Sequence, residues 1–159
     1  MLTGGLYRHV VLVALLALLA GCGESVVVPK WPDTVPCEGT VTYDGKPLTE
    51  AQILFIPDAS TTGQGASGTT DASGKYSLSS RNSAGETVKG IIPGKYRVSF
   101  SRMVKPDGAP WIPDPANPVG PASIGAREEM PLKYSDPANS LQLAEVKAGG
   151  APVDFTLKK

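Results

Sequence analysis

The stretch PGKYRVSFSR, residues 93–102, decides the fold of this chain. After the Pro93-Gly94 turn the side chains alternate in polarity. The apolar residues on one face are Tyr96, Val98 and Phe100, and the polar residues on the other are Arg97, Ser99 and Ser101. A period of two is typical of a β-strand with one face in a core and the other in water. The stretch therefore predicts a half-buried strand over 95–102.

Six further stretches between Gly, Pro and Asp-Gly turns also predict strands; in 52–57 both faces are apolar, which allows both to be covered. We expect strands at 35–43, 52–57, 65–70, 75–80, 141–146 and 152–157. No stretch from residue 34 onward has helical spacing of its apolar residues. Seven short alternating strands predict an all-β protein, a seven-stranded antiparallel β-sandwich. Cys37 falls on the inward face of the first strand, and we expect its thiol to be buried.

Residues 104–131 depart from this pattern, with seven prolines and Trp111 among them. Two interpretations remain open for so long a connection. It is either an extended irregular loop packed on a sheet edge, or a surface that displays Trp111 to a ligand or partner. Proline pre-orders the backbone and so lowers the entropy lost on binding, which fits the second interpretation.

The N-terminal stretch VVLVALLALLAGCGES, residues 10–25, contains an apolar run of eleven residues behind Arg8. An eleven-residue helix is about 16 Å long, roughly half the thickness of a bilayer core. A basic start, a short apolar run and small residues after it are typical of a cleaved secretory signal. The exit, Leu19-Ala20-Gly21-Cys22, resembles the lipobox of bacterial lipoproteins, which implies cleavage before Cys22 and acylation of its sulfur.

This interpretation divides the chain into a signal peptide (1–21), a lipidated tether (22–33) and a single domain (34–159). Acyl chains on Cys22 would hold an exported protein on a cell membrane or an outer membrane. Which of the two membranes remains open. An ordinary secretory signal with an incidental cysteine is the alternative. Trp31, in the tether, would pack on the domain or rest at the membrane interface.

Charge and histidine content exclude several functions. Removing Arg8 with the signal leaves 15 − 1 = 14 Lys and Arg against 15 Asp and Glu, so no basic field is available for nucleic acid. The single histidine, His9, also lies in the signal. A mature chain without histidine cannot use Ser-His-Asp or Cys-His catalysis. We therefore expect no catalytic residues, no metal ligands and no cofactor.

Two weaker signals have ordinary explanations. The stretch TDASGKY, residues 70–76, has an acid and a serine near a glycine, but it lacks the alternating acids of a calcium loop, so a turn is favoured. Glu128 and Glu129 are adjacent and would point to opposite faces of an extended chain, which does not suit a catalytic carboxylate pair. A solvated loop explains them better.

Three stretches together resemble the carboxypeptidase regulatory-like, or transthyretin-like, domain. They are GTVTYDGKPLTEAQILFIP (39–57), GTTDASGKYSL (68–78) and IIPGKYRVSF (91–100). The tail LKYSDPANSLQLAEVKAGGAPVDFTL (132–157) resembles the end of small bacterial lipoproteins built on that domain. The resemblance implies a prealbumin-like sandwich that serves as an accessory, adhesion or binding module.

We therefore expect a membrane-anchored, non-catalytic lipoprotein of the cell envelope, serving as a structural or protein-interaction module. Its partners would be the membrane, through Cys22, and an envelope protein or glycan. The alternative is a carbohydrate-binding module, because related sandwiches bind sugars with exposed aromatic residues. The candidate ligand contacts for that function are Trp111, Trp31 and Tyr134.

Overall fold

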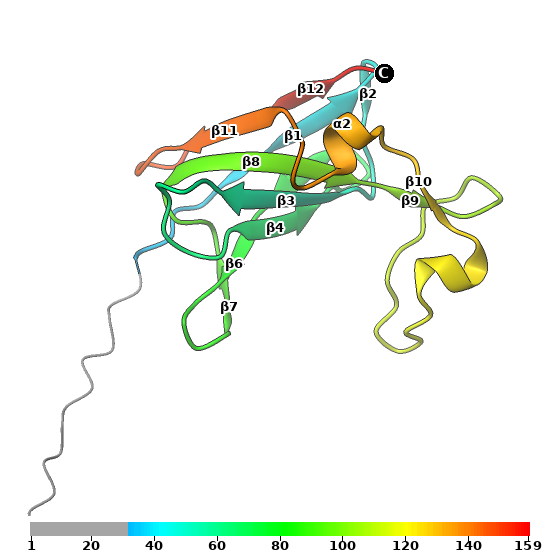
Figure 1. Ribbon diagram of the computed structural model, residues 1–159, viewed down its shortest axis with the longest axis horizontal. Coiled ribbons are helices and arrows are strands. Elements are labelled where there is room, and N and C mark those ends of the chain that lie inside the picture. The colour runs from blue at the N-terminus through cyan, green and yellow to red at the C-terminus, as the bar shows by residue number, and fades with distance from the viewer. Residues whose placement is uncertain (1–31) are drawn as a thin grey trace, which may run out of the picture. The chain divides into compact units, whose positions relative to one another are not determined.

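The computed structural model describes residues 32–159, which lie within one compact unit. Two sheets face each other across a core (Figure 1). One sheet holds β1 (Glu38–Tyr43), β2 (Lys46–Pro47), β5 (Lys75–Ser77) and β12 (Phe155–Leu157). The other runs in the order β11 (Gln142–Val146), β8 (Gly94–Ser101), β3 (Gln52–Pro57), β4 (Ala66–Thr69), β6 (Ser79–Arg81) and β7 (Thr87–Lys89). The expected all-β sandwich is confirmed.

The segment between β8 and β11 carries the remaining elements. They are β9 (Met103–Val104), η2 (Pro121–Ile124), β10 (Arg127–Glu128) and the one-turn helix α2 (Leu132–Ser135). β9 and β10 pair with each other as a separate two-stranded ladder. In Figure 1 the chain between them swings out beyond the ends of β3 and β8.

The core forms where the alternating faces of the two sheets meet. Tyr96, Val98 and Phe100 of β8 are buried as the sequence predicts. Phe155 of β12 crosses from the first sheet, and its ring centroid lies 5.0 Å from that of Phe100 and 6.1 Å from that of Phe55 in edge-on geometry. Cys37 is 3% exposed, which confirms the expected burial.

The strand expected at 75–80 is in fact two strands, and each belongs to a different sheet. β5 pairs with β1, whereas β6 pairs with β4. Leu78, between them, is buried, and its N–H donates to the Cys37 carbonyl oxygen at 2.9 Å. One side chain that enters the core at this corner lets the chain change sheets, which alternation alone does not predict.

The first sheet contains a parallel pair, which corrects the expectation of antiparallel pairing throughout. β1 and β12 run side by side with Val41 opposite Phe155 and Tyr43 opposite Leu157. The approach is tight at Gly39, where a Cβ atom would stand 2.0 Å from the Val153 carbonyl oxygen. Only glycine lets the segment that leads into β12 come this close to β1.

The turn expected at Asp44-Gly45 is confirmed, since both residues have positive φ, 50° and 77°. The short strands β2, β7, β9 and β10 were not expected. Each has only two or three residues, which is too short for an alternating pattern of apolar and polar side chains, and is recognised only by its pairing with a neighbouring strand.

Candidate functional site

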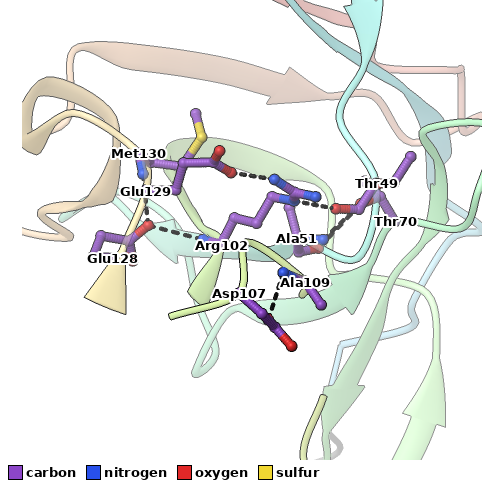
Figure 2. Close-up of polar contacts among 9 residues, drawn as sticks. All are labelled: Thr49, Ala51, Thr70, Arg102, Asp107, Ala109, Glu128, Glu129 and Met130. Carbon is purple, nitrogen blue, oxygen red and sulfur yellow. Dashed lines mark hydrogen bonds and ion pairs between the residues drawn. The ribbon is translucent and has the colours of Figure 1, made fainter. Parts of the chain in front are cut away.

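Arg102, directly after β8, ties the long segment to the sheet (Figure 2). Its Nε donates to the Thr49 carbonyl oxygen at 2.8 Å, and its guanidinium group forms an ion pair with Glu129. Its own backbone N–H donates to Glu128 Oε1 at 2.9 Å. One arginine thus joins the end of β8, the turn before β3 and the return of the long segment.

Glu128 accepts three hydrogen bonds at this junction. The donors are Ser101 Oγ at 2.5 Å, the Arg102 N–H at 2.9 Å and the Met130 N–H at 2.8 Å. The solvated-loop interpretation of Glu128 and Glu129 is therefore incomplete, because Glu128 lies in β10 and accepts these bonds. Both are exposed, but each is bound to residue 102, and together they fasten residues 128–130 to the end of β8.

Trp111 is placed by a hairpin that the sequence did not predict. Val104 and Pro110 form a β-bridge, and the Trp111 N–H donates to the Met103 carbonyl oxygen at 2.8 Å. The turn between them is closed by Asp107, whose Oδ1 accepts from the Ala109 N–H at 2.9 Å (Figure 2). The backbone of this part of the proline-rich segment therefore holds Trp111 in a defined place.

A cleft of about 120 Å³ lies between this hairpin and the outer face of the second sheet. Its floor is a row of side chains across three strands, in which Gln52 is paired with Thr69 on one side and with Ser101 on the other. We call it the Trp111 cleft. The residues that line it are Glu50, Gln52, Thr69, Ser101, Met103, Trp111, Ile112 and Pro113.

Glu50 stands at one wall of the cleft with its backbone in the left-handed region, at φ 54°. Few residues other than glycine and asparagine adopt this conformation without strain. Thr70, which is buried, holds it in place. Its carbonyl oxygen accepts from the Glu50 N–H at 3.1 Å. Its Oγ1 accepts from the Ala51 N–H at 2.9 Å (Figure 2).

Several polar groups of the cleft have no partner among the described residues. The side chains of Glu50, Gln52 and Thr69 make no hydrogen bond or ion pair within 32–159, and neither does the indole N–H of Trp111. The cleft therefore combines an aromatic ring with a carboxylate, a carboxamide and a hydroxyl group that are all available to a ligand.

The three aromatic candidates have different outcomes. Trp111 is partly exposed and lines the cleft. Tyr134 is 7% exposed, which corrects its assignment as an exposed contact. Its hydroxyl group donates to the Lys158 carbonyl oxygen at 2.8 Å and accepts from the Lys158 N–H, so the residue fastens α2 to the end of β12. Trp31 and Cys22 lie outside the described residues.

A second surface lies at the far end of the same sheet face, along β11. β11 is an edge strand that pairs only with β8 within residues 32–159. Leu141 and Leu143 are 81% and 76% exposed, unusual values for leucine side chains beside a sheet edge. We use the name β11 edge for Leu143, Glu145 and the outward edge of β11, together with Leu141, which directly precedes the strand.

The β11 edge opens onto a depression of about 860 Å³ over the outer face of β3, β8 and β11. Ile56, Arg97 and Leu143 lie opposite one another across the three strands. The next row along places Lys95 beside Glu145, while the Lys95 carbonyl oxygen accepts from the Asp58 N–H at 3.0 Å. The guanidinium group of Arg97 has no hydrogen-bond or ion-pair partner in the described part of the chain.

The turn interpretation of residues 70–76 is supported by the geometry. Asp71 Oδ1 accepts from Ser73 Oγ and from the Ser73 N–H, both at 2.7 Å, and from the Lys75 N–H at 3.0 Å. These bonds, that of the Ser73 hydroxyl group first, hold the pKa of Asp71 below its ordinary value. No group of three or more His, Cys, Asp or Glu side chains within 32–159 is arranged to hold a metal ion.

Burial raises the pKa of the Cys37 thiol to about 11, with a smaller contribution from the charge of Glu38. A thiol with so high a pKa is almost fully protonated at neutral pH and is a poor nucleophile.

No helix among the described residues is both long and apolar enough to cross a bilayer.

Comparisons with known proteins add little. No family model and no curated protein sequence matches this chain. Among solved structures, a 9R-lipoxygenase from Cyanothece PCC8801 aligns with 98% of this chain at 16% identity and a TM-score of 0.35. The chain spans 20% of the length of that protein. A likeness this distant carries no argument about fold or activity.

Proposed function

We propose that this protein is a lipid-anchored, non-catalytic module of the cell envelope that binds another envelope protein through the β11 edge. The sequence of the signal and Cys22 supports the anchor, and the exposed edge strand supports the binding role. The observation that carries the proposal is an apolar sheet edge, left uncovered by residues 32–159, beside a large depression.

Among the described residues, no strand pairs with the backbone groups along the outer side of β11. On β8, the Val98 carbonyl oxygen points toward β11 and accepts a hydrogen bond from Ser140 Oγ. The Lys95 carbonyl oxygen points toward the β3 side and accepts one from the Asp58 N–H. Backbone groups alternate in direction along a strand, so the residues of β11 opposite Val98 and Tyr96 point toward β8. Leu143 and Glu145 therefore direct their N–H and C=O groups away from the sheet.

These groups suit an extended segment of a partner chain, added as a further strand. Such a strand would place one side chain beside Leu143 and another, two residues away, beside Glu145. Leu143 favours an apolar neighbour. Because Asp58, Lys95 and Glu145 alternate in charge across the sheet, a basic side chain beside Glu145 would continue the alternation.

The test uses the full chain in its native envelope, with a photo-crosslinking residue in place of Leu143. Substitution of Ser67, exposed on β4 of the same sheet, provides the matched control. We expect a crosslink from position 143 to an extended segment with an apolar and a basic residue two positions apart, and none from position 67.

A second variant tests the contact at Glu145, both its backbone and its side chain. Glu145→Pro removes one outward N–H together with the carboxylate, it leaves the inward bonds of β11 in place, and proline is tolerated at sheet edges. We expect it to abolish the crosslink while the protein still unfolds cooperatively. Equal crosslinking from positions 143 and 67, or capture that survives Glu145→Pro, would refute binding at the edge. Separately, an unmodified Cys22 in the mass spectrum of the N-terminal peptide would refute the anchor.

A further inference from the structure

We propose that the Trp111 cleft binds a single neutral or amino sugar residue. This site lies at the opposite end of β3 and β8 from the β11 edge, so the inference goes beyond the proposed protein contact and does not depend on it. Gln52 starts β3 at the cleft, whereas Ile56, near the end of β3, faces the depression beside β11.

The free polar groups of the cleft match the chemistry of a sugar. A carboxylate such as Glu50 accepts hydrogen bonds from two neighbouring hydroxyl groups, and the carboxamide of Gln52 both donates and accepts. The Thr69 hydroxyl group adds a third contact of either kind. All three groups line the cleft without a partner among the described residues, so a ligand need not break bonds within residues 32–159 in order to reach them.

Trp111 supplies the apolar face that a pyranose ring requires. Sugar rings present C–H groups on one side, and a flat aromatic ring covers them with little loss of conformational entropy. The backbone of Trp111 is fixed by its bond to Met103 and by the bridge of Val104 with Pro110. Because this hairpin is already formed, little conformational entropy of the protein is lost when a ligand binds.

The charge of the cleft selects the class of sugar. Among the described residues that line the cleft, Glu50 alone carries a charge. A carboxylate or phosphate group on the ligand would be repelled, whereas an amino group would be attracted. The volume of about 120 Å³ suits one sugar residue at the end or side of a glycan rather than a buried oligosaccharide. Neutral and amino sugars are therefore favoured over acidic ones.

The experiment applies the full-length chain in detergent to an array of neutral, amino and acidic glycans. Calorimetric titration with the methyl glycoside of the strongest ligand follows. We expect binding of neutral or amino sugars, a loss of affinity of at least about tenfold in Trp111→Ala, and near-normal affinity in Trp111→Phe, which keeps an aromatic face. Glu50→Gln should reduce the discrimination against acidic sugars.

Leu143→Ala is the matched control, because it shortens an exposed apolar side chain on the other surface. It should leave sugar affinity unchanged, and thermal unfolding should show that Trp111→Ala remains folded. Absence of binding to every glycan at millimolar concentration would overturn the inference. So would equal affinity in Trp111→Ala and the parent protein, or a preference for acidic sugars.

Discussion

Replacing Glu128 by alanine should detach the return of the long segment from β8. The substitution removes an acceptor that takes hydrogen bonds from Ser101 Oγ and from two backbone N–H groups. A hydrogen bond contributes about 0.5–1.5 kcal/mol to stability. Because Glu128 is exposed, water replaces part of what is lost, and the lower end of this range applies to each bond. We expect the free energy of unfolding to fall by about 1.5 kcal/mol.

The assay is urea denaturation followed by hydrogen exchange of residues 103–131. Glu129→Ala is the neighbouring control, since it removes one solvent-exposed ion pair with Arg102, worth about 0.5 kcal/mol. Exchange should accelerate in the hairpin that carries Trp111 in the Glu128 variant and change little in the Glu129 variant. Equal destabilisation by the two substitutions, or unchanged exchange in Glu128→Ala, would refute the argument that residue 128 is the principal fastening.

Three further outcomes follow from the structure. Cys37, with a pKa of about 11, should not react with a thiol reagent at pH 8 while the protein is folded. In the unfolded protein one thiol per chain should react if Cys22 is acylated, and two if it is not. Hydrogen bonds from the Thr40 hydroxyl and N–H groups hold the pKa of Asp154 below its ordinary value of 3.8. The stability that Asp154 contributes is therefore fully present above pH 3.8 and is lost as the pH falls through the lower pKa of the folded state. Urea denaturation from pH 7 down to pH 2 should therefore show a decline below about pH 4, and a decline of equal slope in Asp154→Asn would contradict this assignment. Glu50→Gly should relieve the backbone strain at φ 54° and raise the free energy of unfolding by about 0.5 kcal/mol. The same substitution should weaken sugar binding. A lower free energy of unfolding in denaturant would show that no strain is stored at this residue.

The sheet cores were predictable because their signal is local. Tyr96, Val98 and Phe100 alternate with polar residues, and no partner strand is needed to recognise their inward face. The same holds for the turn at Asp44-Gly45, since the two residues themselves favour positive φ. For these features the amino-acid sequence contains the physical cause.

The candidate site was only partly predictable because it is assembled across strands. Trp111 is recognisable as a candidate because it is a tryptophan within the proline-rich segment 104–131. The polar row is not, because the alignment of Gln52 with Thr69 and Ser101 depends on the register of three strands. Tyr134 was misplaced because a four-residue helix carries too few residues to reveal a buried face. The role of Glu128 depends equally on contacts with a segment 26 residues earlier in the chain.

The pairing of the first strand with the last also has a kinetic consequence. Asp154 meets Thr40 across 114 residues, so β1 lacks its neighbour on that side until β12 has been synthesised. Closing so long a loop is entropically costly, and contacts of this separation slow folding. The first sheet of a growing chain should therefore remain open, and the sandwich should be complete only after β12 has followed the rest of the chain.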